Sequence, residues 1–242
     1  MSNSTVMTRK DMKEPDKFQV AAGQAASWVA GHRKGVIAAV VAVAAAAVLA
    51  AAVSTWQASR TEQAGAALSE VLRVAGGEIT AVPLPGLPGP FFKDEAERNR
   101  AVLDAARKVR EGFAGSDAST QAALLAGDAH LGLREWDAAV GAYNDYLTNA
   151  DAKDPMRFGA LEGLAVAEEG RGKLDAAAAT YERLAKEVPF YADRADFERA
   201  RILAAQGKED EARKLLEGFA EKHAKSPLVG EAAERLARMG GK

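Results

Sequence analysis

The segment GKLDAAAATY, residues Gly172–Tyr181, is one copy of a pattern that the chain carries three times. A second copy, REWDAAVGAY, begins thirty-eight residues earlier at Arg134, and a third, GKEDEARKLL, begins thirty-five residues later at Gly207. A sequence that resembles itself at such a period predicts a stack of similar structural units. Each copy has an alanine five positions after its first residue and a large side chain nine positions after it: Ala139 and Tyr143, Ala177 and Tyr181, Ala212 and Leu216.

Each copy predicts two antiparallel helices joined by a turn. Gly172 and Gly207 can end the first helix and reverse the chain, and a later proline ends the second helix. Small residues on both sides of the turn let the helices approach closely, and the large residue fills the groove between one hairpin and the next. Ordinary packing in a helical bundle is the alternative explanation. The small residues seven positions before the turns are Gly127, Ala165 and Ala200. The later prolines are Pro155, Pro189 and Pro227.

These spacings resemble the tetratricopeptide repeat, in which small residues, a turn glycine, aromatic residues and a proline recur about every thirty-four residues. The first copy departs from this pattern at Arg134, where glycine is usual, and the third has polar Asp196 and Arg199 at apolar positions. The resemblance implies an all-α fold. The predicted fold is an α-solenoid of about four tetratricopeptide-like helical hairpins over residues 57–242, with a C-terminal capping helix at Leu228–Met239.

The first hairpin is predicted to be irregular. Apolar residues at helical spacing predict helices over residues 57–75 and 94–113. Residues 83–90 between them contain four prolines, which predict an extended loop with no helix or central strand. A connector is the simpler interpretation of this loop, and a polyproline ligand is the alternative.

Residues 35–53, GVIAAVVAVAAAAVLAAAV, contain no charged or strongly polar side chain. As a helix they would extend about 28 Å, close to the hydrocarbon thickness of a bilayer. Basic residues precede the stretch, and Trp28 and Trp56 flank it, as at the ends of membrane helices. The stretch therefore predicts a single transmembrane anchor. A cleaved signal peptide and a soluble alanine-rich helix are the alternatives.

Charge predicts the orientation of the anchor. Residues 1–34 carry six basic and three acidic residues, and the positive-inside rule keeps such a segment in the cytoplasm. Residues 57–242 are then periplasmic, and the protein is a single-pass inner-membrane protein. Residues 1–13 are polar and predicted to be unstructured. An amphipathic helix is predicted to follow them, either lying on the membrane surface or simply leading into the anchor, with an apolar side formed by Phe18, Ala22, Ala25 and Val29.

Composition argues against several functional classes. The chain has no cysteine, which excludes disulfides, thiol catalysis and thiolate metal sites. Its net charge of −2 and the absence of a large basic patch argue against nucleic-acid binding. The three histidines are far apart, without a metal-ligand spacing or a catalytic motif. We therefore expect no enzyme activity, no cofactor, no metal site and no small-molecule substrate.

Solenoids of helical hairpins bind other proteins on a concave face lined mainly by the first helix of each hairpin. The tetratricopeptide pattern predicts which side chains face that groove. They run from acidic to basic along the chain, with one aromatic residue that could anchor a partner. These groove residues are Gln121, Asp128, Glu162, Glu169, Arg194, Phe197 and Arg201.

The whole arrangement resembles the YfgM-like family. The likeness is carried by DKFQVAAGQAASWVAGHRKG, the anchor, WQASRTEQAGAALSEVL after it, and the repeat at Gly172. It implies an ancillary subunit of the Sec translocon, anchored in the inner membrane, whose protein partners are the translocon channel and periplasmic chaperones or exported clients. The alternative is a membrane-tethered scaffold for cell-envelope or outer-membrane assembly without translocon contact.

Overall fold

The computed structural model describes residues 17–80, 86 and 88–240. The predicted unstructured start at 1–13 and residues 83–85 and 87 of the proline loop therefore lie outside the described residues. The chain forms two compact units, Met1–Ser59 and Arg60–Lys242.

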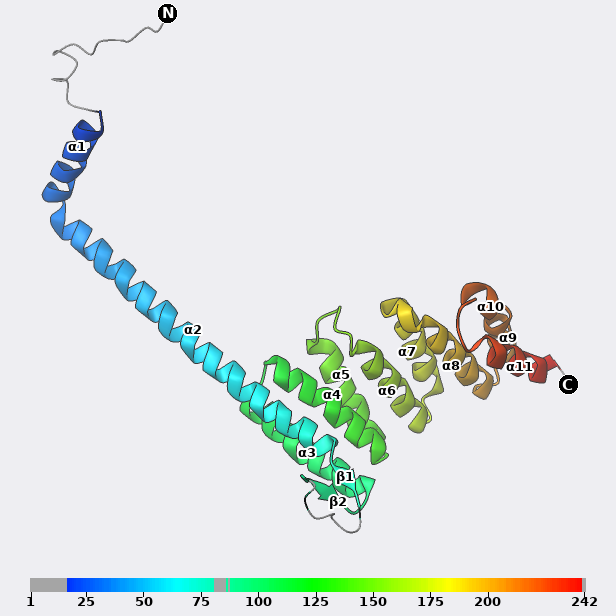
Figure 1. The fold of residues 1–242 in the computed structure, drawn as a ribbon. Coiled ribbons are helices and arrows are strands. Elements are labelled where there is room, and N and C mark those ends of the chain that lie inside the picture. Colours follow the sequence, from blue (N-terminus) through cyan, green and yellow to red (C-terminus); the bar gives the residue numbers. More distant parts are fainter. Residues whose placement is uncertain (1–16, 81–85, 87, 241–242) are drawn as a thin grey trace, which may run out of the picture. The chain divides into compact units, whose positions relative to one another are not determined.

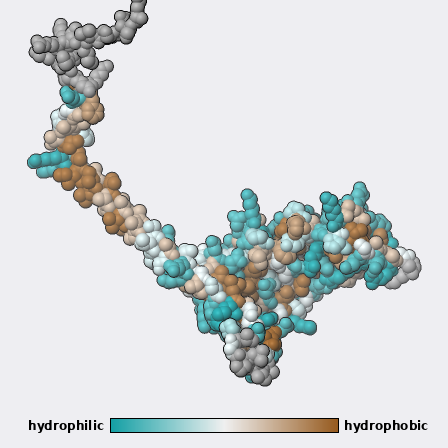
Figure 2. Space-filling model, viewed as in Figure 1, coloured by the Kyte–Doolittle hydropathy of each residue, from teal (hydrophilic) through white to brown (hydrophobic). Residues whose placement is uncertain are grey.

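The first unit consists of helix α1, Lys17–Gly31, and the beginning of helix α2, Arg33–Ala75, with a turn at His32 between them (Figure 1). Among the described residues, α2 contains one stretch that is long and apolar enough to cross a membrane, and none of that stretch is buried by protein. Figure 2 shows the hydrophobic side chains that this helix leaves exposed. A signal sequence near the N-terminus would meet the same criteria of length and composition.

The second unit is a stack of antiparallel helix pairs, which confirms the predicted all-α solenoid (Figure 1). The regular pairs are α4 with α5, α6 with α7, and α8 with α9, and each helix packs on the next one along the chain. The bounds are α3 Glu95–Gly112, α4 Asp117–Gly132, α5 Trp136–Asn149, α6 Arg157–Gly170, α7 Leu174–Glu187, a 3-10 turn Pro189–Tyr191, α8 Ala192–Ala205, α9 Glu209–Glu217, α10 Phe219–Lys222 and α11 Val229–Gly240.

The three repeated turns share one backbone conformation. Arg134, Gly172 and Gly207 have φ angles of 59°, 71° and 76°, in the left-handed region. The amide of the following residue donates across the helix end, for example from Lys173 to the carbonyl of Glu168 at 2.8 Å. This is the Schellman arrangement, which satisfies carbonyls that would otherwise be left unpaired at the helix end. Arg134 adopts this conformation without being a glycine.

The large residue of each repeat fills the space between hairpins, as the pattern predicts. Tyr143 of α5 has no exposed area. A Cβ atom on Gly127 of α4 would lie 2.7 Å from the Tyr143 ring, and one on Gly163 of α6 would lie 2.3 Å from it. Glycine on both sides thus lets the ring insert between two successive hairpins. Tyr181 and Leu216, at the same repeat position, are also buried.

The first hairpin of this unit consists of the end of α2, from Arg60 onward, and α3. One apolar cluster joins Val71 and Val74 of α2 to Val102 and Val109 of α3. Between the helices, strands β1, Glu78–Ile79, and β2, Phe91–Phe92, pair in parallel, which the sequence did not predict. Such pairing is compatible with the nearby prolines because the amides of Glu78 and Thr80 donate to the carbonyls of Pro90 and Phe92.

The last helices enclose a small third cluster. Phe197, Ala200, Leu216, Phe219 and Ala232 are buried together. Helix α11 supplies Ala232 and packs against α9, while Glu231, Glu234 and Arg238 on its other side are exposed. A polar outer face on a terminal helix is what ends a solenoid in water.

Candidate protein-binding surface

Helices α6 and α8, the first helices of two successive hairpins, are joined by two ion pairs. Arg194 Nε lies 2.5 Å from Glu162 Oε1. The guanidinium of Arg201 binds both carboxylate oxygens of Glu169, at 2.6 and 2.7 Å. The two acids are seven residues apart, as are the two arginines, so both pairs lie on the same helix faces two turns apart. Four of the predicted groove residues are thus brought together, but as partners of one another.

Arg201 is the centre of a slightly larger network. Its Nε also donates to Glu198 Oε2 at 2.7 Å. Hydrogen bonding to Arg201 lowers the pKa of Glu169, and the same bond raises the pKa of Arg201. Sequence reasoning missed Glu198, although its position three residues before Arg201 on one helix could have indicated the contact. The predicted run from acidic to basic charge is therefore largely neutralised within the protein.

Asp128 lies beside the hydroxyl end of the buried Tyr143 side chain. The Tyr143 hydroxyl donates to Asp128 Oδ1 at 2.7 Å after the ring has passed between α4 and α6. Desolvation raises the pKa of Asp128, and the hydrogen bond from Tyr143 opposes part of this rise. The residue is nevertheless exposed to water. A carboxylate can be in contact with water and still be partly desolvated when it lies in a hollow whose walls surround it.

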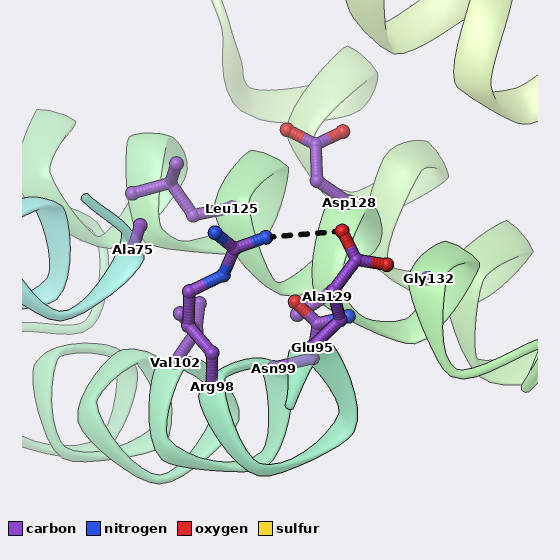
Figure 3. Close-up of a pocket in the computed structure, with 9 residues that line it drawn as sticks. All are labelled: Ala75, Glu95, Arg98, Asn99, Val102, Leu125, Asp128, Ala129 and Gly132. Carbon is purple, nitrogen blue, oxygen red and sulfur yellow. Dashed lines mark ion pairs between the residues drawn. The ribbon is translucent and has the colours of Figure 1, made fainter. Parts of the chain in front are cut away.

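That hollow is a cavity of about 290 Å³ between the end of α2, α3 and α4 (Figure 3). Figure 3 shows Arg98 pointing from α3 toward α4, with its ion pair to Glu95 at 3.8 Å. Asp128 is the predicted groove residue that lines this cavity, together with Asn99, Leu125 and Gly132. Gln121, two turns before Asp128 on the same face of α4, donates to Asp154 Oδ2 at 3.1 Å and so fixes the segment before α6.

Phe197 does not face solvent. Its side chain is 5% exposed, and its ring meets the ring of Phe219 edge-on with centroids 6.2 Å apart. The guanidinium of Arg235, from α11, lies over the Phe197 ring, 3.9 Å from its centroid. The expectation that Phe197 faces an open groove overlooked α11, which covers this part of α8. In this structure Phe197 is a core residue and not an exposed anchor.

Two of the three histidines have a carboxylate partner in the fold. His223 Nε2 lies 2.8 Å from Asp196 Oδ2, which also accepts from Lys222 Nζ at 2.7 Å, and His130 Nδ1 lies 2.6 Å from Glu135 Oε2. The contacts with His223 and Lys222 explain why Asp196 can be buried. Within the described part of the chain, no group of three or more metal-binding side chains comes together.

Comparison with known proteins gives the same repeats. A family model of the tetratricopeptide repeat matches residues 124–192 and 164–227. A solved structure described as the crystal structure of MamA protein is similar to 52% of this chain, with 21% identity and a TM-score of 0.46, and the match spans 65% of the length of that chain. No curated protein sequence matches. Residues 124–227 are thus similar to tetratricopeptide repeats, and solenoids of such hairpins form extended concave binding surfaces.

Proposed function

We propose that this tetratricopeptide-repeat protein is a membrane-anchored adaptor that assists proteins leaving the Sec translocon. In this proposal residues 35–53 span the inner membrane, residues 1–34 remain in the cytoplasm and the solenoid lies in the periplasm. The observation that carries the proposal is helix α2. The same helix, Arg33–Ala75, contains an apolar stretch long enough to span a bilayer and ends in the first hairpin of the solenoid.

Several features support insertion of this stretch. Val40, Val43 and Leu49 are more than half exposed and none of the apolar window is buried, so no protein core accounts for its apolar character. Its eight Val, Ile and Leu residues each contribute roughly 0.3–0.6 kcal/mol toward insertion. Trp28 and Trp56 near its two ends are 60% and 61% exposed, which suits residues at a membrane interface. The anchor is only moderately apolar, so contact with other membrane helices would help to hold it.

The direction of insertion follows from charge. Residues 1–34 have a net charge of +3, from six basic and three acidic residues, and Arg33 and Lys34 directly precede the apolar stretch. Basic residues at the end of a membrane helix are retained in the cytoplasm. The solenoid would then be exported, and the complete lack of cysteine in the chain is compatible with an oxidising compartment.

The binding surface is proposed to be the face formed by α4, α6 and α8. Its charges are largely paired internally, so a partner gains little from Arg194 or Arg201 unless it displaces Glu162 or Glu169. Binding of this kind is weak and exchangeable. Anchoring compensates, because a tethered module acts at a high effective concentration wherever its partner emerges from the membrane.

The resemblance to the YfgM-like family supports the Sec channel as the membrane partner and periplasmic chaperones or exported clients as the soluble partners. The test is co-purification with the channel after extraction in mild detergent. The intact protein should bring the channel with it, and a variant in which an unrelated apolar helix replaces residues 35–53 should do so less. Recovery only in an envelope complex that lacks the channel would favour the scaffold alternative.

A further inference from the structure

We infer that helix α1 lies flat on the anionic cytoplasmic surface of the bilayer, with its Phe18 side in the lipid and its Ser27 side in water. This inference rests on the proposed anchor, because it assumes that residues 35–53 span the membrane. It adds a second membrane contact, of a different kind, to the same protein.

The first observation is that α1 is exposed along its length and apolar on one side. All of its residues from Phe18 to Gly31 are exposed, including Phe18 at 78% and Trp28 at 60%. At about 100° per residue, Phe18, Ala22, Ala25 and Val29 fall within one narrow sector, and Trp28 and Gln19 lie on its two flanks. Gly23, Gln24 and Ser27 lie on the other side, where Val20 is an apolar exception.

The second observation is the position of this helix. α1 ends at Gly31 and α2 begins at Arg33, so a turn of one residue, His32, separates them. The imidazole of His32 stacks on the indole of Trp28 at 4.8 Å, and its Nδ1 lies 3.0 Å from the Trp28 carbonyl. Only three residues separate Gly31 from the proposed membrane span. The end of α1 is therefore held within about 10 Å of the hydrocarbon boundary.

Charge favours a lipid occupant over a protein one. Residues 17–61 contain no aspartate or glutamate, and Arg33 and Lys34 stand at the junction with the span. Lys17, Arg33 and Lys34 are attracted by the negative headgroups of the cytoplasmic leaflet, and no acid within residues 17–61 opposes that attraction. An apolar helix side with bulky aromatic residues, next to a membrane and free of acids, is the pattern of an interfacial helix.

The absence of cysteine allows a direct test. Single cysteines are introduced at Ala25 and at Ser27, two residues apart but on opposite sides of α1, into the full-length protein. Each is spin-labelled in nanodiscs that contain phosphatidylglycerol, and its collisions with oxygen, which enriches in lipid, and with a water-soluble nickel complex are compared. A spin label at Val43→Cys tests whether residues 35–53 lie within the membrane.

We expect the label at Ala25→Cys to collide mainly with oxygen and the label at Ser27→Cys mainly with nickel. Replacing Phe18 and Trp28 together by serine should abolish this difference while the protein stays in the disc. Two water-exposed labels, or two equally lipid-exposed labels, would overturn the inference, as would an Ala25→Cys label that neither reagent reaches because protein covers it. A nickel-accessible label at Val43→Cys would instead show that the anchor itself is wrong.

Discussion

The guanidinium of Arg201 in α8 donates to both carboxylate oxygens of Glu169 in α6, at 2.6 and 2.7 Å. The two residues are thirty-two positions apart and belong to successive hairpins. The pair therefore fixes how one repeat sits on the next, and it occupies side chains that would otherwise be open to a partner. A partner of this surface has to compete with an intramolecular contact.

The first prediction concerns the strength of that contact. A double-mutant cycle with Glu169→Gln and Arg201→Gln should give a coupling of about 1 kcal/mol, because the pair is bidentate and only partly exposed. Glu234 and Arg238 form the control, since both side chains are 76% exposed and 3.7 Å apart. Urea melts of the four variants of each cycle measure both couplings. Equal couplings for the two pairs would show that the Glu169 contact has no special role.

The second prediction concerns the glycine against which Tyr143 packs. Gly163→Ala would place a Cβ 2.3 Å from the Tyr143 ring, and the ring cannot retreat because Gly127 lies against its other side. We expect a loss of roughly 1–3 kcal/mol in the free energy of unfolding. Gly159→Ala, in the same helix but with nothing within 4 Å, should be neutral or stabilising by up to about 1 kcal/mol. Denaturant midpoints that move equally for both variants would contradict this packing.

The third prediction concerns the turn of the first repeat. Arg134 has a φ of 59°, a conformation that costs a residue with a side chain about 1 kcal/mol. Arg134→Gly should therefore stabilise the protein by up to about 1 kcal/mol, while Gly172→Arg, the reverse exchange at the next repeat, should destabilise it by a similar amount. Thermal unfolding of both variants checks the opposite signs, and a fall in stability for Arg134→Gly would mean that its side chain makes a contact worth more than the strain.

Much of this fold could be predicted from the sequence because the repeated spacing of small and large residues reflects how the helices pack. The spacing of Gly127, Ala139 and Tyr143 reflects a ring inserted between helices, and the turns at Gly172 and Gly207 follow from the conformational freedom of glycine. The short β1–β2 pairing was not predictable, because two-residue strands carry no periodicity.

The predicted groove was less accurate, since a repeat pattern gives the face of a helix but not what covers it. Phe197 has the right position in α8, yet Arg235 of α11 lies over its ring. Likewise, charge along the sequence does not reveal that Glu162 and Arg194 neutralise each other across thirty-two residues. Such contacts depend on how adjacent hairpins are rotated, which local spacing does not encode.

The fourth prediction follows from the raised pKa of Asp128, whose main cause is desolvation. A raised folded-state pKa gives a contribution to stability that is full below the unfolded value of 3.8 and is lost as pH rises through the folded value. Asp128→Asn cannot titrate and can still accept from Tyr143. The variant should therefore gain stability relative to the natural protein as pH rises from below 3.8 toward neutral. A difference that does not change with pH would contradict this.

The most direct test of the central claim is the topology of the cysteine-free chain in intact cells. Single cysteines at the exposed positions Ser27 and Lys173 are treated with a maleimide that crosses the outer but not the inner membrane. The account predicts that Lys173→Cys is labelled in intact cells and that Ser27→Cys is labelled only after lysis, with both proteins retained in carbonate-washed membranes. Labelling of Ser27→Cys but not Lys173→Cys in intact cells, or release of the protein from the membranes, would contradict it.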